Sequence, residues 1–144
     1  MIYRPATFSD CASLAAIEQR QPRCAQWGEA GWRSEMEVPA AYILCAQEQS
    51  VVAGFVALRL AEEVCEIVNV GVLPEYSRRG IASQLLKQAL LWVREHGGRQ
   101  VTLEVGAENI PAVCLYKKIG FVMMGKRKNF YQGREDALVM GQNV

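Results

Sequence analysis

The chain has 144 residues, 51% of them hydrophobic, and a formal net charge of +1. This length suits one compact core, so we expect a single domain over residues 1–144. The near-neutral charge and the lack of an apolar run of about 18 residues argue against nucleic-acid and membrane partners. A strand-like segment follows Met1 directly, in place of a signal sequence, which predicts a cytoplasmic protein.

The N-terminal half alternates strand and helix signals. Residues 2–6 predict a strand, and Ser9 or Asp10 offers an N-cap to a helix that buries Leu14 and Ile17. A second helix is expected near residues 29–37. Three aliphatic, strand-like segments follow, at 42–46, 51–60 and 64–72, with a hairpin between the first two.

The C-terminal half begins with the clearest helical pattern. After Pro74 the apolar positions recur with helical period, at Ala82, Leu85, Leu86, Ala89, Leu90 and Val93. Gly97 and Gly98 can end this helix. Residues 101–105 predict a strand, Asn109 to Gly120 a short helix with the apolar stripe Ala112, Leu115, Tyr116 and Ile119, and two strands follow, from Phe121 and over 136–140. This alternation predicts an α/β or α+β fold in one domain.

A glycine-containing turn opens the long helix. It consists of Arg78, Arg79, Gly80, Ile81, Ala82 and Ser83. Backbone N–H groups converge at a helix N-terminus and bind anions, so this turn could hold a pyrophosphate without a metal ion. A lone glycine fits an ordinary turn with solvated arginines equally well, since neither a Walker motif nor a full dinucleotide fingerprint is present.

Glu104 and Tyr116 form a second candidate group, because a carboxylate and a phenol can serve as general base and general acid. Their spacing alone favours a solvated strand residue and a core aromatic. Cys114 is a weaker candidate for a nucleophile, because His96 is the only histidine and lies at a helix end. The five cysteines show no C-x-x-C spacing, which predicts reduced thiols and no metal site.

Two motifs resemble the GNAT acetyltransferases over nearly the whole chain. The family pattern [QR]-x-x-G-x-[GA] corresponds to residues 77–82, with Ser77 in place of Gln or Arg. The pattern N-x-x-A-x-x-L-Y-x-x-x-G-F is met in full by Asn109, Ala112, Leu115, Tyr116, Gly120 and Phe121. The resemblance implies a mixed, splayed β-sheet with helices on both faces and acetyl-CoA as co-substrate, with no metal.

The resemblance also implies residue roles. Glu104 would deprotonate the amine, directly or through water, and Tyr116 would protonate the departing thiolate in a direct transfer. Arg78 through Ser83 would hold the pyrophosphate, with Asn109 also on the cofactor side. The backbone of Val70, Gly71 and Val72 would run along the pantetheine arm and the acetyl carbonyl.

Within this superfamily the chain resembles the RimI-type enzymes, which acetylate the N-terminal alanine of a ribosomal protein. The likeness rests on the segments 17–20, Trp27, 103–105, 129–131 and 133–137. It implies that Glu18, Trp27, Tyr131 and residues 135–137 form peptide-binding walls. A small-molecule amine acetyltransferase, for a polyamine, an amino acid or an antibiotic, and a silent acyl-CoA-binding module remain alternatives. The sequence leaves the acceptor, the binding order and the oligomeric state open.

Overall fold

A computed structural model describes residues 1–131 and 135–144, and of residues 129–131 it describes the backbone alone. The described strands form one mixed sheet in the order β1-β2-β3-β4-β5-β7-β6. The strands are β1 (Ile2–Pro5), β2 (Ala41–Glu48), β3 (Val51–Ala61), β4 (Val64–Val72), β5 (Gln100–Gly106), β6 (Val122–Tyr131) and β7 (Glu135–Asn143). Neighbouring strands are antiparallel, except that β4 and β5 run parallel.

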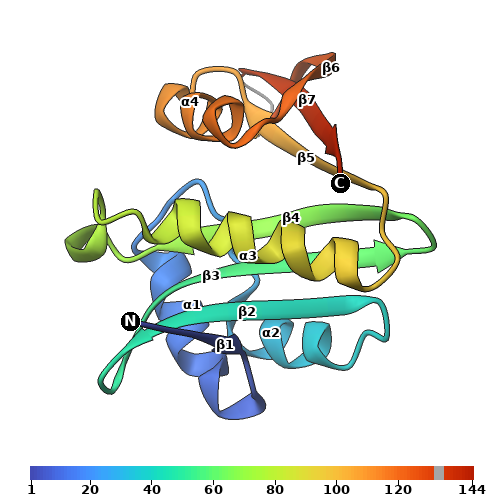
Figure 1. The fold of residues 1–144 in the computed structure, drawn as a ribbon. Coiled ribbons are helices and arrows are strands. Elements are labelled where there is room, and N and C mark those ends of the chain that lie inside the picture. Colours follow the sequence, from blue (N-terminus) through green and yellow to red (C-terminus); the bar gives the residue numbers. More distant parts are fainter. Residues whose placement is uncertain (132–134) are drawn as a thin grey trace.

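Helices cover both faces of the sheet, as the sequence predicts (Figure 1). They are α1 (Cys11–Gln19), α2 (Gly28–Met36), α3 (Ile81–Glu95) and α4 (Ile110–Ile119). Strand β3 is buried on both sides, because alternate side chains of a strand point to opposite faces. Phe55 packs in the core under α1 and α2, whereas Val56 packs in the core under α3 and α4. The mixed sheet with helices on both faces is thereby confirmed.

Helix α3 explains the strong helical period of the sequence. Its buried stripe is Ile81, Leu85, Leu86, Ala89 and Val93. Burying each large aliphatic side chain stabilises the fold by roughly 1.5–3 kcal/mol. The helix begins after Gly80 at φ +76° and ends at His96, followed by Gly97 at φ +87°. Ala82 and Leu90, which the sequence assigned to the stripe, lie half-buried at its margins.

The start of α1 differs from the prediction. Asp10 stands at the N-cap position, but its carboxylate does not cap the helix. It accepts a hydrogen bond from the Thr7 backbone N–H (2.7 Å) and pairs with Arg4 (2.8 Å). The Asp10 carboxylate thus binds the Arg4 guanidinium instead of the N–H groups at the helix end. The hydrogen bond from Arg4 lowers the pKa of Asp10 below the usual value.

The sheet opens at its centre. β4 and β5 pair only from Val64 opposite Gln100 to Ile67 opposite Leu103. Just beyond, a bulge leaves Val68 as an extra residue in β4, because Ala57 and Leu58 of β3 pair with Asn69 and Ile67. The strands then diverge, and β5, α4, β6 and β7 lie apart from β1 to β4 in Figure 1. The predicted splay is confirmed, and it leaves two strand edges facing one opening.

Among the described residues, no helix has the length and apolarity that a membrane crossing requires.

Candidate active site

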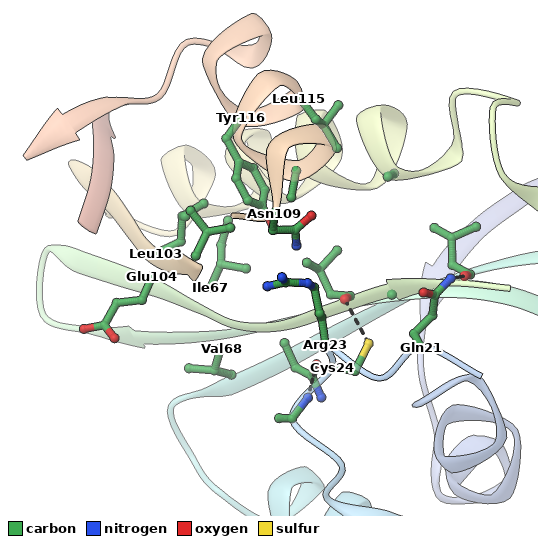
Figure 2. A pocket seen from close by; sticks show the side chains of 18 of the residues that line it. Gln21, Arg23, Cys24, Ile67, Val68, Leu103, Glu104, Asn109, Leu115 and Tyr116 are labelled. Carbon is green, nitrogen blue, oxygen red and sulfur yellow. Dashed lines mark hydrogen bonds between the residues drawn. The ribbon is translucent and has the colours of Figure 1, made fainter. Parts of the chain in front are cut away.

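A cavity of about 940 Å³ lies where β4 and β5 diverge (Figure 2). It is lined by β4, β5, α4, the start of α3 and the connection between α1 and α2. Seven of the residues singled out from the sequence line it: Val70, Gly71, Val72, Ala82, Glu104, Asn109 and Tyr116. The other five lie outside the lining: Arg78, Arg79, Gly80, Ile81 and Ser83.

The turn before α3 presents backbone groups to this region. The first backbone bond of the helix is donated by Gln84 N–H to Gly80 O (3.0 Å), so the N–H groups of residues 81–83 lie at the open helix end. Two side chains of the turn are engaged elsewhere. Arg79 pairs with Glu48 (2.8 Å) and its guanidinium lies 5.0 Å from the Tyr76 ring centre, while Ile81 is buried in the core.

The unusual Ser77 of the turn does not reach the helix end. Its hydroxyl donates to Pro74 O (2.7 Å). The Ser77 side chain therefore makes no described contact with the N–H groups of residues 81–83, which lie at the helix end.

Glu104 and Tyr116 approach the cavity from different elements. Tyr116 of α4 is 6% exposed and meets Phe121 edge-on, with ring centres 5.8 Å apart. Glu104 of β5 has a side chain that is 29% exposed and pairs with Arg127 (3.2 Å). Figure 2 shows Tyr116 directed from α4 toward the strands, and Glu104 directed away from it at the end of the cavity.

Comparison with known proteins identifies this arrangement. The model of the Acetyltransferase (GNAT) family matches residues 8–121. The chain belongs to the GNAT family. Its enzyme class is that of the family, an acetyl-CoA-dependent N-acetyltransferase.

Individual relatives share a named acceptor. A Bacillus subtilis (strain 168) protein, provisionally named a ribosomal protein bS18-alanine N-acetyltransferase, is 34% identical over 73% of this chain and 70% of its own length. The Escherichia coli (strain K12) protein of that name is 33% identical over 61% of this chain and 62% of its own length. The crystal structure of the ribosomal-protein-S18-alanine N-acetyltransferase from Escherichia coli superposes with a TM-score of 0.89 at 26% identity, covering 99% of this chain and 93% of the other.

The connection between α1 and α2 is the part of this GNAT site that the sequence did not identify. It lies along the open edge of β4. Gln21 Nε2 donates to Val72 O (2.6 Å), and the Cys24 thiol donates to Val70 O (3.2 Å). A residue between helices carries no periodic signal, and these bonds join positions about 50 apart in the sequence, so local patterns could not reveal them.

Glu18, on α1, hydrogen-bonds the end of this connection. The sequence placed Glu18 and Trp27 in a peptide-binding wall, and for Glu18 this is wrong, because it is 1% exposed and lies outside the cavity lining. Its carboxylate accepts four hydrogen bonds, from Trp27 N–H (2.9 Å), Gly28 N–H (3.1 Å), Trp32 Nε1 (2.9 Å) and Asn69 Nδ2 (2.9 Å). Trp27 also lies outside the lining and packs on Trp32, with ring centres 4.7 Å apart.

The remaining residues of the expected walls lie near the start of β7. The side chain of Tyr131 falls outside the described residues, as do Gly133 and Arg134 of the RimI-type likeness. Glu135 is described and forms an ion pair with Arg23.

The cysteines take no part in a described catalytic pair. Four are buried and Cys114 is exposed on α4. Burial raises the pKa of the Cys24 thiol to about 12, so the cysteine nearest the open edge stays protonated at neutral pH. In the part of the chain that the structure describes, no group of three or more His, Cys, Asp or Glu side chains could hold a metal.

Proposed function

We propose that this chain transfers the acetyl group of acetyl-CoA to the N-terminal α-amine of a protein that begins with alanine, with a ribosomal protein as the acceptor. The observation that carries the proposal is the cavity at the split of β4 and β5, where Glu104, Tyr116 and the open edge of β4 meet. The named acceptor of the similar bacterial proteins supports the choice of substrate. We further propose that residues 1–144 act as one GNAT domain in the cytoplasm.

The cofactor side of the site fits acetyl-CoA chemically. The open end of α3 offers N–H groups at residues 81–83 to the pyrophosphate, and charge-assisted bonds of this kind contribute about 1.5–3 kcal/mol each. Beyond Ile67 the backbone of β4 no longer pairs with β5. The carbonyls of Val70 and Val72 accept from Cys24 and Gln21, which leaves the N–H groups of this edge to hydrogen-bond the carbonyls of the pantetheine arm. Ala112 and Leu115 give that arm an apolar wall, and Asn109 lies beside them.

The chain's own residues would move two protons. Acetyl-CoA supplies a thioester carbonyl, which the neutral amine attacks, so that a C–N bond forms and the C–S bond breaks. Glu104 accepts the proton that leaves the amine, through an intervening water, and Tyr116 donates its phenolic proton to the departing thiolate. Transfer is direct, because the protonated Cys24 thiol is a poor nucleophile.

An α-amine suits a carboxylate base. The α-amino group has an ordinary pKa of about 7.7–8.0 and lysine about 10.4, so neutralising the α-amine at pH 7 costs roughly 3.5 kcal/mol less. Glu104 can therefore be a weaker base for an α-amine acceptor than for a lysine acceptor.

The decisive experiment is intact-mass analysis of an N-terminal Ala peptide incubated with protein and acetyl-CoA, followed by kcat/KM for this peptide, for spermidine and for an internal-lysine peptide. We expect at least a tenfold preference for the Ala peptide, about 1.4 kcal/mol. Tyr116→Phe and Glu104→Gln should each lower kcat by about 10²–10⁴-fold, with part of the Glu104→Gln loss recovered at higher pH. Equal or better kcat/KM for spermidine would replace this proposal with a small-molecule acceptor, and no turnover of any amine would favour a silent acyl-CoA-binding module.

A further inference from the structure

One ion pair bridges the opening in the sheet. Arg23 comes from the connection between α1 and α2, on the β4 side of the cavity, and Glu135 begins β7 on the β5 side. Arg23 Nη1 lies 2.8 Å from Glu135 Oε1. The Arg23 side chain is 41% exposed and that of Glu135 only 9%, so the carboxylate is the fixed, buried end of the pair.

The pair is seated on the end of β5. Glu135 also accepts the backbone N–H of Glu108 (2.6 Å), which fixes its carboxylate. A Cβ at Gly106 would lie 2.7 Å from Glu135 Cδ and 2.8 Å from Arg23 Nη1, so the pair rests directly on the Gly106 backbone. Gly106 follows Glu104 by two residues and faces the same side of the strand, about 7 Å away. Arg23 therefore lies one strand repeat beyond the proposed base.

The cavity meets the cationic end of this pair. Arg23 lines the cavity, whereas Glu135 does not. Figure 2 shows the Arg23 guanidinium extending into the cavity below Asn109. Two carboxylates, Glu66 and Glu104, also line it. An entering molecule thus meets negative charge near Glu104 and positive charge at Arg23.

We infer that Arg23 determines acceptor specificity by donating hydrogen bonds to the first peptide carbonyl of the acceptor while the acceptor's amine lies at Glu104. The inference rests on the proposed function. A peptide N-terminus carries a carbonyl oxygen on the carbon next to the one that bears its amine, and a guanidinium offers a planar set of five N–H donors for such an oxygen. A polyamine has no carbonyl, and its second ammonium group would be repelled by Arg23.

The test compares two acceptors in the same variants. In Arg23→Met, kcat/KM for the N-terminal Ala peptide should fall at least tenfold, mainly through KM, while kcat/KM for spermidine stays the same or rises. Arg23→Lys keeps the charge without the planar donors, so it should still discriminate against spermidine while losing part of the peptide activity. Gly106→Ala keeps both charges but displaces the pair, and should lower peptide activity in the same direction.

Two controls separate this role from a structural one. Arg20→Met removes an exposed arginine, paired with Glu75, from the same connection and should leave both kcat/KM values within twofold of wild type. The acetyl-CoA Kd, measured by calorimetry, should stay within twofold in every variant. An equal fall for both acceptors, or no fall in Arg23→Met and Gly106→Ala, would overturn the inference. Wild-type protein that does not prefer the Ala peptide would instead overturn the proposed function, whatever the variants do.

Discussion

Replacing Glu18 by Gln should destabilise the fold by about 3 kcal/mol. The carboxylate receives two N–H donors on each oxygen, and a glutamine amide would turn its own NH₂ toward two of them. The Trp27 backbone N–H cannot turn away, and Asn69 cannot present its oxygen without losing Ala25 N–H (3.3 Å). Two charge-assisted bonds contribute about 3–6 kcal/mol, partly offset because a buried amide costs less desolvation than a carboxylate.

Urea unfolding followed by circular dichroism would measure this loss in the free energy of unfolding. Thermal unfolding should show a fall in Tm of about 6–12 °C at this chain length. The control is Glu37→Gln, since Glu37 is exposed at the end of α2 and should change the free energy of unfolding by less than about 0.5 kcal/mol. If Glu18→Gln unfolds at the wild-type urea concentration, the four-bond geometry does not describe the solution state. Because Glu18 holds the connection that carries Arg23, the folded variant should also show a raised KM for the Ala peptide.

Two further predictions concern the cofactor turn and the thiols. Gly80→Asp should weaken acetyl-CoA binding at least tenfold by calorimetry, because it places a negative charge at the pyrophosphate end of α3. Gly80→Asn tolerates the same positive φ and should bind acetyl-CoA within a few-fold of wild type. Equal losses in both variants would implicate the backbone instead of the charge. With iodoacetamide at pH 8, peptide mapping should find Cys114 modified well before Cys24, whose pKa of about 12 leaves almost no thiolate; equal rates would contradict the burial of Cys24.

Local patterns predicted the elements because each one buries a regular face. β4 occupies the predicted residues 64–72, and α3 repeats its apolar positions at helical period over four turns. The predictions were less accurate where the packing of another element determines whether a side chain is buried. In α4 the predicted apolar stripe of Ala112, Leu115, Tyr116 and Ile119 packs against the core, but Ala112 and Leu115 are only half-buried and also line the cavity. Val113, which the predicted stripe left out, is buried with Tyr116. The splay of the sheet turns one flank of α4 toward an opening that no local pattern reports.

Long-range polar contacts could not be predicted from local sequence patterns. Glu18 and Asn69 are 51 residues apart, and Arg23 and Glu135 are 112 apart. A glutamate at the end of a helix is ordinarily solvated, so nothing local distinguishes Glu18 from Gln19. Its burial follows from the bulge in β4, which carries Asn69 beneath the connection between α1 and α2.

The two sides of the cavity use different kinds of atoms, and this difference explains which part of the function the sequence could predict. The proposed cofactor side uses backbone groups at the start of α3 and along β4, whose positions depend on a few glycines and on strand geometry. Such positions leave a short, specific motif. We propose that the acceptor side relies on side chains, above all Arg23 from the connection between α1 and α2 and Glu104 from β5. A change at Arg23 could then alter the acceptor while Gln21 and Cys24 keep their bonds to the cofactor edge of β4. For this chain, we therefore expect the choice of acceptor to depend on Arg23, which packs with Glu135 against Gly106, more than on the motif that places the chain in the family.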